Sequence, residues 1–247
     1  MSRFFSGFSN NTPPVTKNLI VINVALWLFS LLFVQMFRVN LNFHLGLFYP
    51  GSPMFKPWQI VTHMFMHDNS RIFHLFFNMW ALWMFGRTLE GVWGSKRFLI
   101  YYLVTGLGAA LVHTLVNYIQ LAPDIAALKA AYSVDRINIT LLNEILQPGN
   151  PFQSLGRELM IPTVGASGAV YGVLLAFGML FPNTPLIIIP IPVPVKAKWI
   201  VVASGVLALY MGLTDKGGNV AHFAHLGGMI FGFILIKYWN KFTRNFF

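Results

Sequence analysis

The chain has 247 residues, of which 56% are apolar and only 10% are charged, well below the roughly 25% of ordinary soluble domains. A soluble fold of this length would leave large exposed apolar patches, whereas a bilayer accommodates them. The absence of cysteine excludes disulfides, thiolate nucleophiles and cysteine-ligated metal centres.

Six apolar segments predict an all-α, polytopic membrane protein with six transmembrane helices, because each helical crossing needs about 20 apolar residues. The segments cover residues 18–37, 72–89, 98–119, 164–181, 199–213 and 220–239. The first segment is not followed by a small-residue cleavage site, so we expect a retained helix. The whole chain, residues 1–247, is expected to form a single membrane domain.

The formal net charge of +10 is explained by the flanks of these segments. Ten of the seventeen lysines and arginines, but only one acid, Glu90, fall on the side that holds both termini. Basic residues favour the cytoplasmic side, so we expect both termini, including residues 1–17, in the cytoplasm of a bacterial cell, with the chain in its inner membrane. No basic run is interleaved with aromatic residues, so no nucleic-acid partner is expected.

Three connecting segments carry their own signals. Residues 38–71 form a long apolar external loop that is expected to lie at the membrane interface. Residues 120–162 form an enlarged external loop with a helix-prone stretch at 124–132 and a turn between Pro148 and Pro151. Residues 181–195 contain five prolines, which predicts an extended cytoplasmic connector.

Ser167 is the first candidate for chemistry. It lies in Gly165-Ala166-Ser167-Gly168, close to the start of the fourth predicted helix. The first N–H groups of a helix lack intrahelical partners and carry the positive end of the dipole, so this position can stabilise an oxyanion. Gly168 is expected to leave space for a substrate backbone. Small residues in membrane helices also serve close packing, and that alternative remains open.

Two histidines in the sixth predicted helix, His222 and His225, can act as the base that a serine nucleophile requires. Gly228 and Gly232 follow His225 and form a small-residue face, which we expect to meet a similar face, Gly168 and Gly172, in the fourth helix. Tyr171 lies four residues after Ser167, on the same helical face, where it can stack on an imidazole and orient it.

His74 and Asn78 share one face of the second predicted helix. Both side chains donate hydrogen bonds, so together with the Ser167 N–H they can form an oxyanion hole. The alternative is that they only join neighbouring helices by hydrogen bonds.

Other chemistries find little support. His63 and His67 have the spacing of zinc-binding histidines, but Met64 occupies the place of the glutamate in His-Glu-x-x-His. No pair of aspartates lies in the predicted helices, which argues against an aspartyl intramembrane protease. No metal ion and no cofactor are expected.

Taken together, the polar motifs resemble the rhomboid family of intramembrane proteases. The matching pieces are His74-x-x-x-Asn78, Gly86-x-x-x-Glu90-x-x-x-Gly94, Gly165-Ala166-Ser167-Gly168 with Tyr171, and Ala224-His225-x-x-Gly228-x-x-x-Gly232. The resemblance implies a six-helix rhomboid-like bundle and a serine endopeptidase with a Ser167–His225 dyad. It favours His225 over His222 as base, and it implies His74 and Asn78 as oxyanion donors.

The resemblance also implies that the substrates are transmembrane proteins, cut near the non-cytoplasmic boundary within the lipid bilayer, and that the fifth helix is a lateral gate. One departure is Gln59 after Trp58, where many members have arginine. An inactive rhomboid-like protein that binds membrane clients is the main alternative, and a transporter lined by polar groups is another. The sequence leaves the oligomeric state open.

Overall fold

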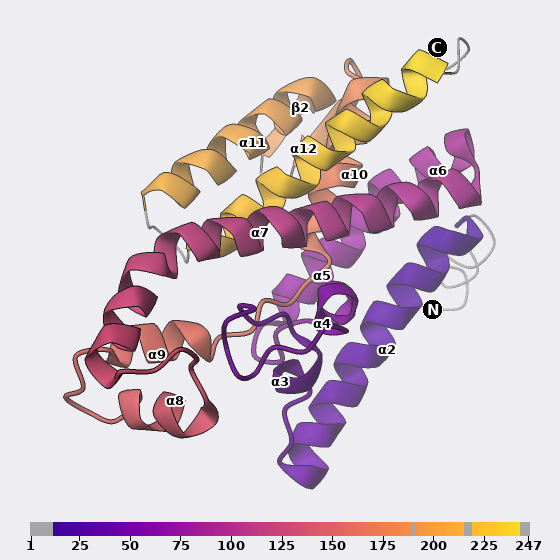
Figure 1. Ribbon diagram of the computed structural model, residues 1–247. Coiled ribbons are helices and arrows are strands. Elements are labelled where there is room, and N and C mark those ends of the chain that lie inside the picture. The colour runs from indigo at the N-terminus through magenta and orange to yellow at the C-terminus, as the bar shows by residue number, and fades with distance from the viewer. Residues whose placement is uncertain (1–11, 189–190, 215–218, 243–247) are drawn as a thin grey trace.

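The computed structural model describes residues 12–188, 191–214 and 219–242, and it is chiefly helical (Figure 1). Its helices are α2 (Pro14–Phe37), α3 (Asn42–Leu45), α4 (Gln59–Thr62), η1 (His63–Phe65), α5 (Ile72–Ala81), η2 (Leu82–Gly86), α6 (Arg87–Trp93), α7 (Ser95–Tyr132), α8 (Ile139–Ile145), α9 (Gln153–Leu159), α10 (Ser167–Leu180), α11 (Ala197–Leu213) and α12 (Asn219–Phe242). The strands are β1 (Pro185–Ile188) and β2 (Ile191–Lys196).

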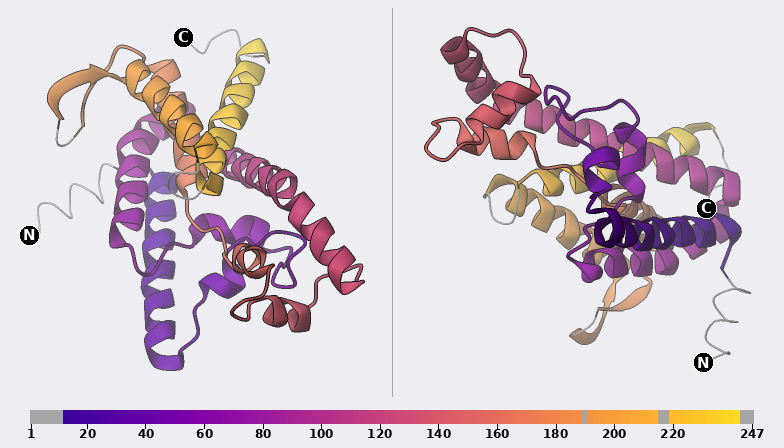
Figure 2. Two further views of the ribbon diagram at one scale, coloured as in Figure 1. Left: turned by 90° about the vertical axis from the view of Figure 1, so that its left-hand side faces the viewer. Right: turned by 90° about the horizontal axis from the view of Figure 1, so that it is seen from below.

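Helices α7, α10 and α12 pack together at the centre of the molecule, with α11 on one side and α2 on another (Figures 1 and 2). A buried apolar core joins α2, the α5–α6 segment, α7 and α10, and includes the fully buried side chains of Leu82, Leu89, Phe98 and Tyr101. The three helices contact one another pairwise, and the candidate serine lies at the start of α10.

Every predicted span coincides with helix. Helices α5, η2 and α6 follow one another without a break from Ile72 to Trp93, with a π-helical turn at η2. Within the described ranges, α2 and α7 are both long enough and apolar enough to cross a membrane. Helices α10 and α11 are shorter and apolar.

Helix α7 is longer than predicted. The sequence indicated an end near residue 119, but the helix continues through Pro123 to Tyr132. Its outer part has a second apolar core to pack on: Leu128 is fully buried against α8 and α9, and Leu121 and Tyr132 contact the same cluster. The stabilisation from this packing exceeds the cost of the backbone hydrogen bond that is lost because Pro123 has no N–H. Figure 1 shows α8 and α9 beside this end of α7, far from the carboxyl-terminal end of α12.

The connector after α10 is extended, as predicted, and its two strands pair as an antiparallel hairpin. The hairpin projects away from the helices (Figure 2). Pro192 and Pro194 occupy alternate positions of β2. Alternate positions share one edge of a strand, so their missing N–H groups can both fall on the unpaired edge.

The loop between α2 and α5 is anchored by Gln59. The side chain is fully buried. Its Oε1 accepts from the Lys56 N–H at 2.9 Å, and its Nε2 donates to the carbonyls of Met54 at 3.1 Å and His44 at 3.3 Å. Trp58 also donates to the His44 carbonyl, at 3.1 Å. An amide therefore ties together three turns of this loop without a guanidinium.

Glu90, on α6, fixes the amino-terminal end of α2. Its carboxylate is 2% exposed and accepts from the N–H groups of Val15 at 2.9 Å and Thr16 at 2.7 Å. It also accepts from the hydroxyls of Thr16 at 2.8 Å and Ser95 at 2.7 Å. The first N–H groups of a helix lack intrahelical partners, so one acid caps α2 and binds it to α6 and α7.

Replacing Glu90 with alanine should destabilise the fold. Glu90→Ala leaves buried donors on α2 and α7 without an acceptor, and we expect the free energy of unfolding to fall by about 3 kcal/mol. Unfolding of the purified protein by SDS in mixed micelles measures the change. The matched control is Glu144→Ala on α8, where the glutamate is exposed and the change should stay within about 0.5 kcal/mol. Equal stability of the two variants would contradict this role of Glu90.

Candidate active site

Ser167 is the first residue of α10. Two residues earlier, Gly165 has a backbone conformation that only glycine adopts readily. Gly165 has φ of +131°, which keeps residues 163–165 out of the helix. The preceding Thr163 pairs with Leu47 of the external loop through two backbone hydrogen bonds, of 2.8 and 2.9 Å. The helix thus begins three residues later than the sequence indicated, and Ser167 lies in its first turn.

His225, on α12, faces this serine. The distance between His225 Nε2 and Ser167 Oγ is 2.9 Å, within hydrogen-bond range. Among the described residues, His225 Nδ1 is buried and has no hydrogen-bond partner. Within the described ranges, the imidazole therefore hydrogen-bonds to the serine and to no third side chain.

Tyr171 lies one turn after Ser167 and stacks on His225. The ring centroids are 4.1 Å apart and the planes differ by 2°, so the two rings are parallel. The ring of His222 is nearly perpendicular to that of His225, at 81°, with 6.0 Å between the centroids. His225, and not His222, is thus the histidine in hydrogen-bond contact with Ser167.

The approach of α12 to α10 depends on Gly228. A Cβ atom on Gly228 would overlap the carbonyl oxygen of Gly168. Gly168 itself is buried, and a Cβ there would collide with Ala109 of α7. The expectation that Gly168 leaves room for a substrate backbone is therefore wrong, because α7 occupies that space.

The other two glycines of the predicted faces meet a third helix instead of one another. A Cβ on Gly172 would collide with Thr105, and one on Gly232 would collide with the hydroxyl group of Tyr101. Both of those residues belong to α7, and the Tyr101 hydroxyl donates to the Gly172 carbonyl at 2.9 Å. Helix α7 thus packs against Gly172 of α10 and against Gly232 of α12.

His74 lies beside the serine, whereas Asn78 is engaged elsewhere. A Cβ atom on Gly165 would lie 3.0 Å from both Cε1 and Nε2 of His74, and 3.7 Å from Ser167 Oγ. The edge of the His74 ring and the serine hydroxyl therefore both adjoin Gly165. The amide of Asn78 donates from Nδ2 to the His74 carbonyl at 2.8 Å. An amide has two N–H donors, so this bond uses one of them.

Two histidines that the sequence analysis had assigned no role hold the segment before Ser167. The Gly165 N–H donates to the carbonyl of His63 at 3.0 Å, and the ring of His63 contacts the Gln59 carbonyl through Nδ1 at 2.9 Å. His113 of α7 contacts Thr163 Oγ1 through Nε2 at 2.6 Å. The loop and α7 thus fix residues 163–165 from two sides.

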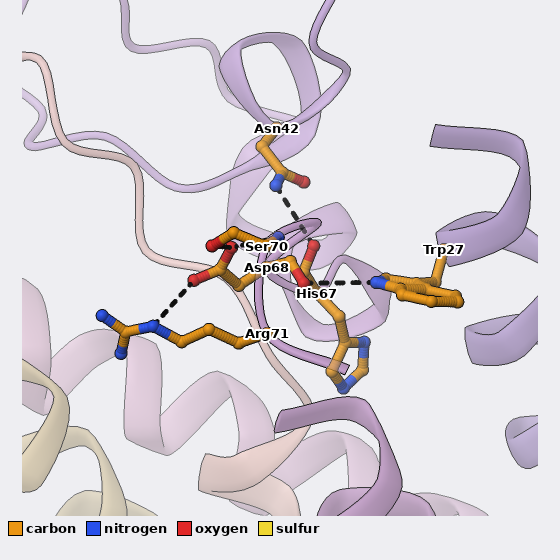
Figure 3. Close-up of polar contacts among 6 residues, drawn as sticks. All are labelled: Trp27, Asn42, His67, Asp68, Ser70 and Arg71. Carbon is orange, nitrogen blue, oxygen red and sulfur yellow. Dashed lines mark hydrogen bonds and ion pairs between the residues drawn. The ribbon is translucent and has the colours of Figure 1, made fainter. Parts of the chain in front are cut away.

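His67 is the most deeply buried of the histidines, with no exposed surface. Its ring lies 5.2 Å from that of His74, and neither ring nitrogen has a hydrogen-bond partner among the described residues. Its backbone is well anchored, because the His67 carbonyl accepts from Asn42 at 3.1 Å and the next carbonyl, that of Asp68, accepts from Trp27 at 3.2 Å (Figure 3). The contact between the His67 and His74 rings could not be predicted from the sequence, in which the two residues are seven positions apart and separated by a loop.

Burial makes His63 and His67 hard to protonate. It lowers the pKa of His63 to about 4 and that of His67 to about 3. The positive charge that His74 can carry lowers the pKa of His67 further. Within the described part of the chain, no group of three or more histidine or acidic side chains is arranged to hold a metal ion.

These features define a class: apolar helical proteins with a partly buried serine–histidine pair at the amino-terminal end of one of their helices. The chain belongs to the rhomboid family, whose members are integral membrane proteins, because the family model described as "Rhomboid domain" matches residues 54–241.

Similar proteins include Rhomboid protein 1, mitochondrial, of Saccharomyces cerevisiae, with 27% identity over 182 residues, 74% of this chain and 42% of that protein. Rhomboid protease AarA of Providencia stuartii is 24% identical over 237 residues, 92% of this chain and 73% of that protein. Presenilin-associated rhomboid-like protein A, mitochondrial, of Danio rerio is 25% identical over 238 residues, 96% of this chain and 51% of that protein. The chain spans about half the length or less of the two mitochondrial relatives.

A methyl group on Gly228 should force α12 away from α10. We expect Gly228→Ala to lower the free energy of unfolding by about 1–3 kcal/mol, because the new Cβ overlaps a backbone oxygen that has no room to move. SDS-induced unfolding measures the effect. The control is Gly205→Ala in α11, where the nearest atom, of Met229, lies at 3.6 Å and the better helix propensity of alanine should be neutral or stabilising. If both substitutions prove equally mild, the close approach at Gly228 is not required for the fold.

The buried His67 should make the protein sensitive to acid. The unfolded chain binds a proton on this residue near pH 6.5, whereas the folded chain binds it only near pH 3, so stability falls as the pH drops below 6.5. Between pH 7 and pH 4.5 we expect His67 to account for a loss on the order of 2 kcal/mol. His67→Phe should remove that part of the loss. His44→Phe, at an exposed histidine, should leave the acid sensitivity unchanged. An unaltered pH profile of His67→Phe would be inconsistent with a buried, neutral His67.

Proposed function

We propose that this chain is an intramembrane serine endopeptidase that cleaves transmembrane segments of membrane proteins near the non-cytoplasmic boundary. The observation that carries the proposal is the 2.9 Å contact between Ser167 Oγ and His225 Nε2, set among apolar helices. Membership of the rhomboid family supports it, and one similar protein is named as a protease. Ser167 and His225 are the proposed catalytic residues.

The proposed topology has six crossings: α2, the α5–α6 segment, α7, α10, α11 and α12. Both termini then lie in the cytoplasm of a bacterial cell, and residues 1–247 form one membrane domain. The distribution of lysine and arginine supports this orientation. Ser167, at the amino-terminal end of α10, then lies toward the outer surface, and α8 and α9 are external.

In the proposed mechanism, Ser167 Oγ attacks the carbonyl carbon of the scissile bond while His225 Nε2 accepts the hydroxyl proton. The negative charge that develops on the carbonyl oxygen is stabilised by backbone N–H groups at the start of α10. The nearby edge of His74 and the second N–H of Asn78 are further proposed donors. The stacked ring of Tyr171 holds the imidazole in the orientation that the proton transfer requires.

His225 then gives the proton to the leaving amine, and the acyl group remains on Ser167. Water, activated by the same imidazole, hydrolyses this ester and restores the free serine. In the part of the chain that the structure describes, no side chain hydrogen-bonds to Nδ1 of His225, so packing against Tyr171 is proposed to take the place that an aspartate has in a triad. This is a dyad mechanism that needs no metal ion.

Access of a substrate helix is proposed to occur beside α11. This helix packs on α12 and α10 and carries none of the proposed catalytic residues. A bond inside a stable helix is shielded by its hydrogen bonds, so transmembrane segments with helix-weakening residues near their outer end are the expected substrates.

Labelling by a fluorophosphonate tests the serine. We expect the purified protein to be labelled and Ser167→Ala to lose the label, because the reagent needs an activated hydroxyl. Ser204→Ala is the matched control, since this serine lies in the apolar helix α11 and its hydroxyl only donates to the Ile200 carbonyl.

His225→Ala should reduce cleavage of a model transmembrane substrate by about 10³-fold or more.

The outcomes separate three functions. Cleavage that persists in Ser167→Ala would exclude the dyad. A wild-type protein that binds the model substrate but is neither labelled nor active would be an inactive client-binding protein. Solute flux into proteoliposomes that survives Ser167→Ala would indicate a transporter.

A further inference from the structure

A pocket of about 590 Å³ lies outside the proposed active site, on the external part of α7. One wall is a single face of this helix, with Tyr118, Ala122, Ile125 and Lys129 at helical spacing. The opposite walls come from residues 49–52 of the external loop and from residues 135–137, which follow α7. Nothing in the proposed mechanism uses this pocket.

The enlarged external loop builds this pocket. Helix α7 ends at Tyr132, and the next residue, Ser133, has φ of +53°, a left-handed conformation that turns the chain back. This turn brings Asp135 and Arg136 beside the face that holds Lys129. The other wall is fixed by Ser52, whose buried hydroxyl donates to the Leu159 carbonyl at 2.9 Å and so ties residues 49–52 to α9.

The charges in the pocket favour an anion. Lys129 and Arg136 contribute two positive charges and Asp135 one negative charge, so the lining has a net charge of +1. Within the described ranges, no ion pair joins either cation to a carboxylate. A lysine and an arginine that line one pocket are suited to a phosphate, which accepts several hydrogen bonds from such side chains.

The position of the pocket favours a lipid. If the hydrocarbon begins near Phe98, after Lys96 and Arg97, a crossing of about 20 residues ends near Tyr118, where the pocket starts. The last third of α7, which contains Pro123, bends away from the direction of the rest (Figure 1). Tyrosines are enriched at this level of a membrane, and Tyr49 and Tyr118 both line the pocket. The apolar side chains of Ala122 and Ile125 can contact the start of an acyl chain.

We propose that this pocket binds the phosphate group of an anionic phospholipid of the outer leaflet. The phosphate lies between Lys129 and Arg136, and the glycerol and upper acyl chain lie along the α7 face toward the membrane. The proposal does not depend on proteolysis, because none of these residues contacts the serine or the histidine.

Native mass spectrometry of the full chain in mixed micelles tests the site, with phosphatidylglycerol as the probe and phosphatidylcholine as the neutral reference. We expect the double variant Lys129→Gln/Arg136→Gln to bind phosphatidylglycerol about tenfold more weakly, a change of about 1.4 kcal/mol in binding free energy. Arg157→Gln, at an exposed arginine on α9 outside the pocket, should bind like the wild type. Asp135→Asn should bind more tightly, since it removes the opposing charge. Raising the salt concentration should weaken binding to the wild type.

Further measurements keep the result unambiguous. The double variant should unfold at the same SDS concentration as the wild type, because Arg136 is exposed and Lys129 is only partly buried, so weaker lipid binding is not a loss of fold. Equal retention of phosphatidylglycerol by all variants would overturn the proposal. Displacement of the lipid by inorganic phosphate would instead assign the site to free phosphate, and displacement by an acidic peptide would assign it to a protein segment; both would overturn it. Retention of the lipid by Ser167→Ala should equal that of the wild type.

Discussion

The whole arrangement depends on the absence of a side chain at one position of α12. With only hydrogen on the α-carbon of Gly228, α12 lies directly on the backbone of α10 at Gly168. This distance lets an imidazole one turn earlier, at His225, reach a hydroxyl at the start of α10. In a membrane, the hydrophobic effect does not drive helices together, because lipid tails are as apolar as the side chains. Dispersion contacts between closely packed backbones therefore hold such helices to one another. The other helices support the contact: α7 fills the space behind Gly168, Gly172 and Gly232.

The segment before the serine is held mainly by the loop between α2 and α5. The side chain of Gln59 fastens α4 to the turns before it, the His63 carbonyl accepts the N–H of Gly165, and Leu47 pairs with Thr163. The position of Ser167 therefore depends on a series of hydrogen bonds that begins more than one hundred residues earlier in the sequence. This loop supports the first turn of α10.

The sequence predicted the helices well because their apolar segments are long and separated by charged or proline-rich stretches. It also predicted the stack of Tyr171 on the ring of His225, because a spacing of four residues defines a helical face. It failed where tertiary packing decides. The end of α7 depends on a second core around Leu128, which becomes visible only when residues 137–159 fold back. Two other features also depend on contacts between distant segments of the chain. One is the packing of Gly172 and Gly232 on α7, and the other is the contact of His67 with His74. Periodicity along one segment does not specify them.

The hairpin between α10 and α11 has a mechanical consequence. The N–H of Ala197 donates to the Thr184 carbonyl at 2.9 Å, and that of Lys198 to the Pro182 carbonyl at 3.2 Å, so the first turn of α11 is fastened to the end of α10. Gly178 and Val201 pack tightly at the same level. A helix of this length is about 25 Å long, so a tilt of about 10° around that fastened end displaces the opposite end by about 4 Å. Any opening of the bundle beside α11 is therefore smallest at this fastened end and widest at the opposite end of the helix.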